Sequence, residues 1–249
     1  MNEIVLRSTG LCRAERGSPP EINLSLERNT LACLVGPSDS GKTLCLRLLG
    51  GLDSPDSGNL EILGRDLWRL DEASRRRLRR RIGYVLPNSA LLSSADVMQN
   101  LILPADYHHI DSAEGIERRA RQLLEWLGYP SAYNSRPVAE LPPCHQRMVA
   151  IARCLMLDPE ILFVDDAFVL CDPELRSRLA GRYLDMKNRL NMTLVLATDD
   201  MEFARRFADV LLYILPQGLR VHDNRTGPDE FLHLLNREGV DDYTRAIEG

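Results

Sequence analysis

The sequence predicts an α/β fold built on a largely parallel β-sheet. Short apolar runs rich in Val, Ile and Leu recur along the chain, and such runs without polar alternation are typical of strands buried on both faces. Segments with a helical pattern separate them, and this alternation is characteristic of parallel α/β proteins. The third observation is a Gly-rich turn at residues 36–43, which lies between an expected strand and an expected helix and has the pattern of a phosphate-binding loop.

The expected elements follow from these patterns in chain order. The strands are expected at residues 3–6, 30–35, 82–86, 160–165, 192–198 and 210–215. The helices are expected at residues 41–50, 70–80, 112–128, 145–157, 173–190 and 200–208. Several helical stretches and no convincing strand occur between residues 88 and 158, which indicates an inserted α-helical subdomain. The predicted organisation is a core of residues 1–87 and 159–223, a helical subdomain of residues 88–158, and a C-terminal extension of residues 224–249.

The composition is that of an ordinary globular protein. The chain has 249 residues, of which 44% are hydrophobic and 27% are charged, and its formal net charge is −5. Nothing in this balance favours binding to nucleic acid or to an acidic membrane. No stretch approaches the roughly 18 apolar residues of a membrane span, so any membrane role is expected to come through a partner.

Six cysteines are scattered along the chain without C-x-x-C spacing. They are Cys12, Cys33, Cys45, Cys144, Cys154 and Cys171. The N-terminus also lacks the charged and apolar regions of a signal peptide. Together these features favour a reducing cytoplasm, with buried thiols that behave as small hydrophobic groups.

The Gly-rich turn matches G-x-x-x-x-G-K-[ST]. Its glycines let backbone N–H groups turn onto phosphate oxygens, and the N-terminus of the following helix favours anions. Lys42 is expected to reach the β- and γ-phosphates of a nucleotide, and Thr43 to hold Mg²⁺. Asp39 is unusual because it adds a carboxylate to an anion-binding loop, and it would weaken binding if it faced the γ-phosphate. The candidate nucleotide-binding residues are Gly36, Pro37, Ser38, Asp39, Ser40, Gly41, Lys42, Thr43 and Leu44.

A second motif supports the first. The apolar run "ILFVDD" ends in Asp165 and Asp166, as a Walker B strand does. Asp165 is expected to hold Mg²⁺ through water, opposite Thr43. Thr43 and Asp165 are therefore the candidate metal ligands, and ATP and Mg²⁺ are the expected cofactors.

The two motifs, their separation and the helical insertion resemble the ATP-binding subunits of ABC transporters over nearly the whole chain. "LGGLDSPDSGNLEILGRDL" at residues 49–67 looks like the stretch after the Walker A helix, and "LRRRIGYVL" at 78–86 like the strand that enters the Q-loop. "VAIARCLMLDPEILFVDD" at 149–166 looks like the signature helix running into Walker B, and "DMEFARRFADVLLYI" at 200–214 like the segment after the H-loop. The resemblance implies a P-loop NTPase core of the ABC type, with an α-helical subdomain insertion and an antiparallel β edge.

The resemblance also implies partners. In this family two subunits meet head to tail as a homodimer or heterodimer, sandwich two ATP molecules, and drive a transmembrane permease that docks on the helical subdomain. The expected location is cytoplasmic, peripheral on the cytoplasmic face of the inner membrane, with membrane contact only through partners and no nucleic acid. "NSALLSSADVMQNLILP" at residues 88–104 and the tail after "GPDEFL" look most like phospholipid-transport ATPases of the Mla or MCE-associated type.

The sequence departs from the family at the positions that carry chemistry. The signature L-S-G-G-Q is replaced by "LPPCH" at residues 141–145; its prolines offer no N–H to a γ-phosphate, although they suit the start of a helix. The Q-loop glutamine aligns with Pro87. The catalytic glutamate aligns with Asp166, which is one methylene shorter. The switch histidine aligns with Asp199, whose carboxylate would repel a γ-phosphate.

A fifth departure concerns the base. No aromatic residue precedes Trp68, so none is available near residues 12–14 to stack on adenine. The D-loop aspartate is expected as Asp172. Together the departures predict weak ATP–Mg binding, hydrolysis that is lost or very weak, and a regulatory or structural role. Asp166 and Asp199 are the candidate catalytic residues, both degenerate.

These losses fall on both halves of a composite ATP site. Because one chain carries them all, an intact partner would complete neither site, and low ATPase activity is expected in a homodimer and in a heterodimer. Two alternatives remain open. One is a slow but active ABC ATPase with Asp166 as its base, and the other is a scaffold that binds no nucleotide and only holds a transmembrane subunit.

Two further features have simpler interpretations. Six arginines in "RRRLRRR" at residues 75–81 favour a solvated helix face over a nucleic-acid or lipid-headgroup patch. Cys144 beside His145 could suggest a thiol nucleophile, but replacement at a relaxed signature is the favoured reading.

Overall fold

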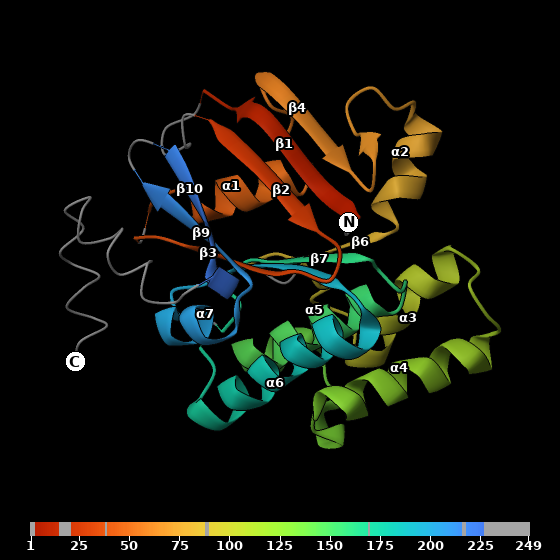
Figure 1. The fold of residues 1–249 in the computed structure, drawn as a ribbon. Coiled ribbons are helices and arrows are strands. Elements are labelled where there is room, and N and C mark those ends of the chain that lie inside the picture. Colours follow the sequence, from red (N-terminus) through yellow and green to blue (C-terminus); the bar gives the residue numbers. More distant parts are fainter. Residues whose placement is uncertain are drawn as a thin grey trace. The chain divides into compact units, whose positions relative to one another are not determined.

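The computed structural model of the protein describes residues 3–14, 21–37, 39–87, 90–168, 170–215 and 218–226. The chain divides into two compact units (Figure 1). Unit 1 comprises Met1–Leu70 and Thr193–Gly249, and unit 2 comprises Asp71–Met192. Unit 2 thus contains the expected helical subdomain together with residues on either side of it. The domain limits drawn from the sequence remain a prediction.

Unit 1 contains an antiparallel sheet with the strand order β2-β1-β4-β5. β1 pairs antiparallel with both β2 and β4, and β4 pairs antiparallel with β5. Buried and exposed residues alternate along β2, as they do in a sheet that packs one face on a core. The strands are β1 (Ile4–Cys12), β2 (Ile22–Glu27), β4 (Ser57–Ile62) and β5 (Arg65–Asp66).

The other strands of unit 1 lie in the order β10-β9-β3-β8. β3 is flanked by two parallel neighbours, β8 and β9, and β10 pairs antiparallel with β9. Every residue of β3, β8 and β9 is buried, which explains why their sequences are continuous apolar runs. Helices α1 and α7 cover opposite faces of these strands (Figure 1). The elements are β3 (Leu31–Val35), β8 (Thr193–Ala197), β9 (Val210–Leu215), β10 (Gly218–Asp223), α1 (Lys42–Leu49) and α7 (Met201–Phe207).

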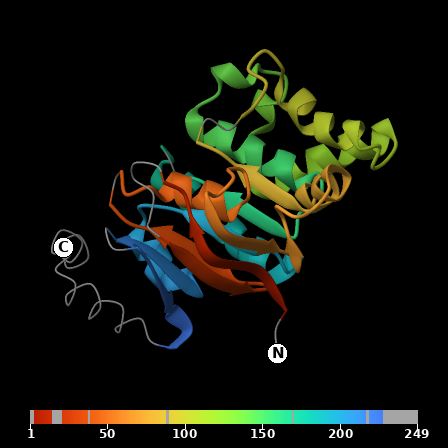
Figure 2. The same cartoon turned by 90° about the horizontal axis from the view of Figure 1, so that it is seen from above.

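Unit 2 combines a pair of parallel strands, β6 and β7, with a group of helices. Helices α3, α4 and α5 follow one another and pack together, α5 also packs on β6, and α6 contacts α4 (Figures 1 and 2). The strands are β6 (Ile82–Val85) and β7 (Ile161–Val164). The helices are α2 (Glu72–Arg79), α3 (Val97–Tyr107), α4 (Ala113–Leu127), α5 (Pro143–Leu155) and α6 (Pro173–Leu190).

The α/β class is confirmed, with both parallel and antiparallel strands. All six strands and all six helices expected from the sequence are present within a few residues of the expected bounds, except that β1 extends to Cys12. The sequence missed β2, β4 and β10, which mix polar and apolar residues, and β5, which consists of two charged residues. It also missed α3, which contains Pro104 but begins with a capping box between Asp96 and Gln99.

The expected C-terminal extension lies mostly outside the described residues. Of residues 224–249, the structure describes the short 3₁₀ turn η3 (Asn224–Thr226). Two further 3₁₀ turns, η1 (Ser131–Tyr133) and η2 (Val138–Glu140), precede α5. Among the described residues no helix combines the length and the apolar character needed to cross a membrane.

One cysteine expectation is wrong. Cys144 and Cys171 form a disulfide, because the fold brings these two sequence-distant residues together. They are therefore not free thiols. The other four thiols are free; Cys33 and Cys45 are buried, as expected. Burial raises the pKa of the Cys45 thiol to about 12, which keeps this group protonated and unreactive at neutral pH.

Candidate functional site

The phosphate-binding loop occupies the turn between β3 and α1 in unit 1. Gly41 precedes the helix in the left-handed region with φ 89°, a conformation that glycine adopts without steric cost. A Cβ atom at Gly36 would lie 2.9 Å from Ser40 Oγ and 3.3 Å from the Ile214 carbonyl oxygen, so the close approach favours glycine. Asp39 is exposed and also has a positive φ, 63°. Ser38 lies outside the described residues.

Lys42 makes three contacts within this unit. Its Nζ donates hydrogen bonds to the carbonyl oxygens of Gly36 at 2.8 Å and Pro37 at 2.9 Å. Nζ also lies 2.9 Å from Oδ1 of Asp199. A lysine ammonium has three donors, so all three have an acceptor supplied by the protein itself. The Lys42 side chain is 15% exposed and that of Asp199 is 64% exposed, so solvent reaches this ion pair mainly from the carboxylate side.

The turn between β8 and α7 positions Asp199. The Thr198 hydroxyl accepts a hydrogen bond from the Asp200 amide at 3.0 Å, and Asp200 in turn caps α7 through the Phe203 amide at 2.9 Å. The Asp199 carbonyl oxygen accepts from the Met201 amide at 3.0 Å. Asp199 therefore lies in a turn that hydrogen bonds hold at Thr198 before it and at Asp200 after it. The sequence predicted repulsion of a phosphate by this carboxylate but did not predict its pairing with Lys42.

The other loop residues include two hydroxyl side chains, those of Thr43 and Ser40. Thr43 is exposed in the first turn of α1, and Leu44 beside it is partly buried. The Ser40 hydroxyl is buried and has no hydrogen-bond partner within the described part of the protein, although its amide donates to the Pro37 carbonyl at 3.2 Å. A buried polar atom without a partner is uncommon. These features fit a loop that receives hydrogen-bonding atoms of a ligand.

The segment where an adenine-stacking ring would be expected contains ion pairs instead. An Arg13 guanidinium nitrogen lies 3.7 Å from a carboxylate oxygen of Asp53, and Arg47 donates two hydrogen bonds to the same carboxylate at 2.7 and 2.8 Å. These bonds from Arg47 hold the pKa of Asp53 below its usual value. The Ala14 amide donates to Asp56 at 2.8 Å. The chain here offers charge and backbone contacts rather than a π-face.

In unit 2 the two aspartates that follow β7 have different surroundings. Asp165 is only 3% exposed; its amide donates to the Val85 carbonyl at 2.8 Å, and its carbonyl oxygen accepts from the buried guanidinium of Arg147. Asp166 is exposed and has a positive φ of 56°. Asp165 is thus held in place by its burial and its backbone hydrogen bonds, whereas Asp166 lies on an exposed turn in an uncommon backbone conformation. The assignment of Thr43 and Asp165 to Mg²⁺ remains a prediction.

The "LPPCH" stretch begins a helix, as expected. Pro142 is the N-cap residue of α5 and Pro143 is its first residue, and no side chain caps this end. Cys144 is held in the disulfide, so the thiol nucleophile considered above is not available in this state. His145 is 9% exposed and packs edge-on against the rings of Tyr129 and Tyr133. Burial lowers the pKa of His145, so this histidine is neutral and structural.

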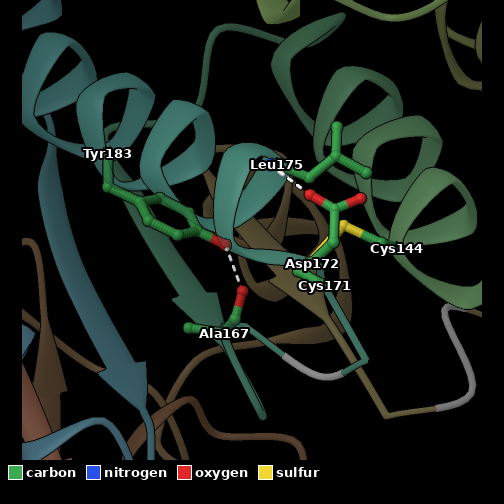
Figure 3. Close-up of a disulfide and its surroundings, with 6 residues drawn as sticks. All are labelled: Cys144, Ala167, Cys171, Asp172, Leu175 and Tyr183. Atoms are coloured by element: carbon green, nitrogen blue, oxygen red, sulfur yellow. Dashed lines mark hydrogen bonds between the residues drawn. A yellow bond between two sulfur atoms is a disulfide. The ribbon is translucent and has the colours of Figure 1, made fainter.

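Two other predicted positions have clear surroundings. Pro87, which aligns with the Q-loop glutamine, is exposed shortly after β6, and the neighbouring Asn88 lies outside the described residues. Asp172 caps α6 by accepting a hydrogen bond from the Leu175 amide at 2.9 Å (Figure 3). Asp172 therefore has a structural role in helix initiation.

Comparison with known sequences identifies curated relatives that are named for import. A methionine import ATP-binding protein MetN of Brucella abortus is 35% identical over 198 residues, which cover 80% of this chain and 53% of that protein. MetN 2 of Paraburkholderia xenovorans is also 35% identical, over 193 residues, covering 78% of this chain and 50% of that protein. The chain thus spans about half the length of the curated relatives it matches.

Solved structures share the fold at lower identity. The dimeric, post-hydrolysis state of the ATP-binding cassette MJ0796 bound to ADP and Pi superposes with a TM-score of 0.81 at 23% identity, covering 88% of this chain and 99% of that one. The cbiO1 protein of Clostridium perfringens, part of the ABC transporter complex cbiONQ, gives a TM-score of 0.76 at 20% identity, covering 99% and 100%. The family model for ABC transporters matches residues 20–169. The chain therefore belongs to the ABC transporter family.

Proposed function

We propose that the protein is an ATP-binding subunit of an ABC-type membrane transport complex, in which ATP–Mg binding is weak and hydrolysis is impaired or lost. The observation that carries this proposal is the ion pair between Lys42 and Asp199. It engages the lysine that the phosphate-loop motif reserves for a nucleotide. It also places a carboxylate beside that lysine.

The phosphate loop still supports binding. The backbone from Gly36 to Leu44 would receive the phosphates, and the buried Ser40 hydroxyl without a partner fits a loop that completes its hydrogen bonds with a ligand. Thr43 and Asp165 would hold Mg²⁺, an ion that supplies charge neutralisation between phosphates. A phosphate that reaches Lys42 must replace one of its three acceptors, and the Asp199 carboxylate competes with it for the ammonium. Affinity is therefore reduced but not abolished.

Hydrolysis is weakened by separate changes in the two units. Asp199 stands where the family has a histidine that contacts the γ-phosphate, and its negative charge opposes further negative charge there. Asp166 is a shorter base than glutamate, and misplacement by about 1 Å can reduce a rate on the order of a hundredfold. Pro142 and Pro143 cannot donate backbone hydrogen bonds at the start of α5. A regulatory or structural role is the result.

The partners follow from the family. We infer a transmembrane permease and a second ABC ATPase subunit, identical or different, with location on the cytoplasmic face of the inner membrane through these partners. The substrate has two candidates. The curated relatives are named for methionine import, whereas residues 88–104 favour phospholipid transport. Uptake of labelled methionine and transfer of labelled phospholipid, measured in cells with and without the gene, distinguish them.

ATP turnover by the purified chain, alone and with its permease, tests the loss of hydrolysis. We expect turnover close to background in both samples. Robust turnover that disappears in Asp166→Asn would support instead a slow, active ATPase with Asp166 as the base. Glu202→Gln is a matched control for the loss of one carboxylate, because Glu202 is exposed and lies outside the predicted catalytic positions.

Titration with labelled ATP and Mg²⁺ tests binding. We expect weak, saturable binding that Lys42→Ala abolishes. Arg206→Ala is the control, because it removes an exposed positive charge from α7 without touching the loop. If the unmodified chain binds nothing, the scaffold that only holds a transmembrane subunit is the better description.

A further inference from the structure

We propose that Cys144 and Cys171 form a thiol–disulfide exchange site that controls the mobility of the segment carrying Asp166. Cys144 is the second residue of α5, and Cys171 lies immediately before Asp172, the N-cap residue of α6. Their Cα atoms are 5.1 Å apart although 27 residues separate them in sequence. Figure 3 shows the bond beside the first turn of each helix.

The bond closes a covalent ring that contains Asp166, one of the two predicted catalytic residues. The ring runs through α5 and β7 and then through residues 165–171, which we call the Asp166 segment and of which residue 169 lies outside the described residues. Reduction would open the ring next to this segment and leave the two helices connected only through the main chain and their packing. The redox state therefore acts directly on the turn that carries Asp166.

Among the described residues of the Asp166 segment, Ala167 and Phe168 contact Tyr183 of α6. The Tyr183 hydroxyl donates to the Ala167 carbonyl at 3.1 Å (Figure 3), and the Phe168 ring packs edge-on against the Tyr183 ring with centroids 5.7 Å apart. Toward its end, Leu170 is 75% exposed, and the Cys171 amide makes a long hydrogen bond of 3.3 Å to the Phe168 carbonyl. The disulfide attaches the end of the segment, at Cys171, to α5.

The backbone of the segment contains two strained residues whose conformation could relax once the disulfide is reduced. Asp166 has φ 56° and Leu170 has φ 48°, and neither is glycine. Left-handed conformations of such residues are strained and persist where surrounding contacts impose them. Loss of the covalent attachment therefore permits relaxation at these two positions.

The bond is also open to exchange chemistry. Cys171 is partly exposed, whereas Cys144 is 2% exposed, so Cys171 is the more accessible of the two to an incoming thiolate. Attack there forms a mixed disulfide with Cys171, breaks the S–S bond and releases the Cys144 thiolate, which takes a proton. The Cys144 sulfur is a favourable leaving group because it lies in the first turn of α5, where the helix N-terminus stabilises negative charge.

A second thiol completes the reaction. It attacks the mixed disulfide at the sulfur of the first reagent and releases Cys171 as a thiol. In total, two molecules of a low-molecular-weight thiol give one molecule of its disulfide, and the protein disulfide becomes two thiols. The reverse reaction, with a low-molecular-weight disulfide as the oxidant, restores the bond.

Thiol counting in the full-length protein tests the exchange. Native protein is equilibrated in mixtures of reduced and oxidised glutathione, quenched with acid and alkylated after unfolding. With six cysteines and two in the bond, the mass should change from four labels in oxidised buffer to six in reduced buffer, and peptide mapping should place the difference on Cys144 and Cys171. Six labels throughout, or four labels until the protein is denatured, would overturn the proposal.

Hydrogen exchange tests the structural effect without any nucleotide, so its outcome is independent of the proposed ATP binding. Amides within residues 165–172 should exchange at least about tenfold faster in the reduced protein, while peptides from β3 and α1 remain unchanged. The Cys144→Ser/Cys171→Ser double variant should reproduce the reduced pattern in oxidised buffer. Cys12→Ser is the control: it should keep the response and give three and five labels. Equal exchange in both redox states of the unmodified protein would refute control of this segment.

Discussion

Replacement of Asp199 by asparagine is expected to tighten nucleotide binding. Asparagine has nearly the same shape as aspartate, so the substitution removes the negative charge and leaves the turn between β8 and α7 in place. The N-cap of α7 is retained, because Asp200 and not Asp199 provides it. The perturbation is thus confined to the carboxylate that lies 2.9 Å from Lys42 Nζ.

The magnitude follows from two contributions. An ion pair in contact with solvent stabilises by about 0.2–1 kcal/mol, and a nucleotide must break this one to reach Lys42. Repulsion between the carboxylate and a γ-phosphate charge about 4 Å away is about 1 kcal/mol in water and about 4 kcal/mol at an effective dielectric of 20. Because Asp199 is 64% exposed, the lower value applies. The sum of about 1–2 kcal/mol corresponds to roughly 5- to 30-fold in Kd.

The assay is a titration of labelled ATP and labelled ADP, each with Mg²⁺, into the unmodified chain and into Asp199→Asn. ATP should gain more affinity than ADP, because ADP lacks the γ-phosphate whose repulsion is removed. The difference between the two proteins should shrink as salt is raised above about 0.15 M, since the charges are accessible to counterions. Glu202→Gln carries the same change in net charge from a nearby exposed position and should alter affinity by less than twofold.

Two results would refute this reasoning. If ATP binds Asp199→Asn no more tightly than the unmodified chain, then the ion pair does not oppose binding. If Glu202→Gln tightens binding as much as Asp199→Asn does, then the effect comes from net charge and not from the contact with Lys42.

Three further predictions concern stability. Tyr183→Phe should lower the free energy of unfolding by about 1–2 kcal/mol in denaturant titrations, because it leaves the buried Ala167 carbonyl without its 3.1 Å hydrogen bond. Gly58→Ala should cost more than Gly64→Ala in the same assay, since both have positive φ but a Cβ at Gly58 would lie 2.2 Å from a backbone oxygen while Gly64 faces open space. Burial depresses the pKa of His145 below 6.5. The stability gained by burying the neutral imidazole is therefore present above pH 6.5 and is lost as pH falls through the folded pKa. His145→Phe should flatten the pH dependence of the denaturant midpoint below pH 6.5.

Apart from β1, the strands that the sequence predicted are almost fully buried, and the strands that it missed are only partly buried. β3 and β8 are buried along their whole length and appear as unbroken apolar runs. β2 and β4 present polar residues to one side. Their few apolar residues form no continuous run, so the segments resemble loop sequence. The phosphate loop was predictable because its chemistry lies in eight consecutive residues.

The contacts that distinguish the site could not be predicted in this way. Lys42 and Asp199 are far apart in the sequence and meet only because β3 and β8 are adjacent in the sheet. Cys144 and Cys171 meet because two helices begin side by side, and their spacing matches no short motif. A linear pattern carries residue identity but not the strand order that creates such pairs.

Both pairs join residues that are distant in sequence. The Lys42 ammonium needs acceptors because its side chain is only 15% exposed, whereas a buried thiol can remain free, as Cys33 and Cys45 do. In unit 1 the Lys42 ammonium finds Asp199, and in unit 2 the Cys144 sulfur finds Cys171. Asp199 and Cys144 both lie at positions where the sequence differs from the family pattern. We propose that at Lys42 a contact within the chain replaces contacts to a ligand, which would account for weak binding by an intact scaffold.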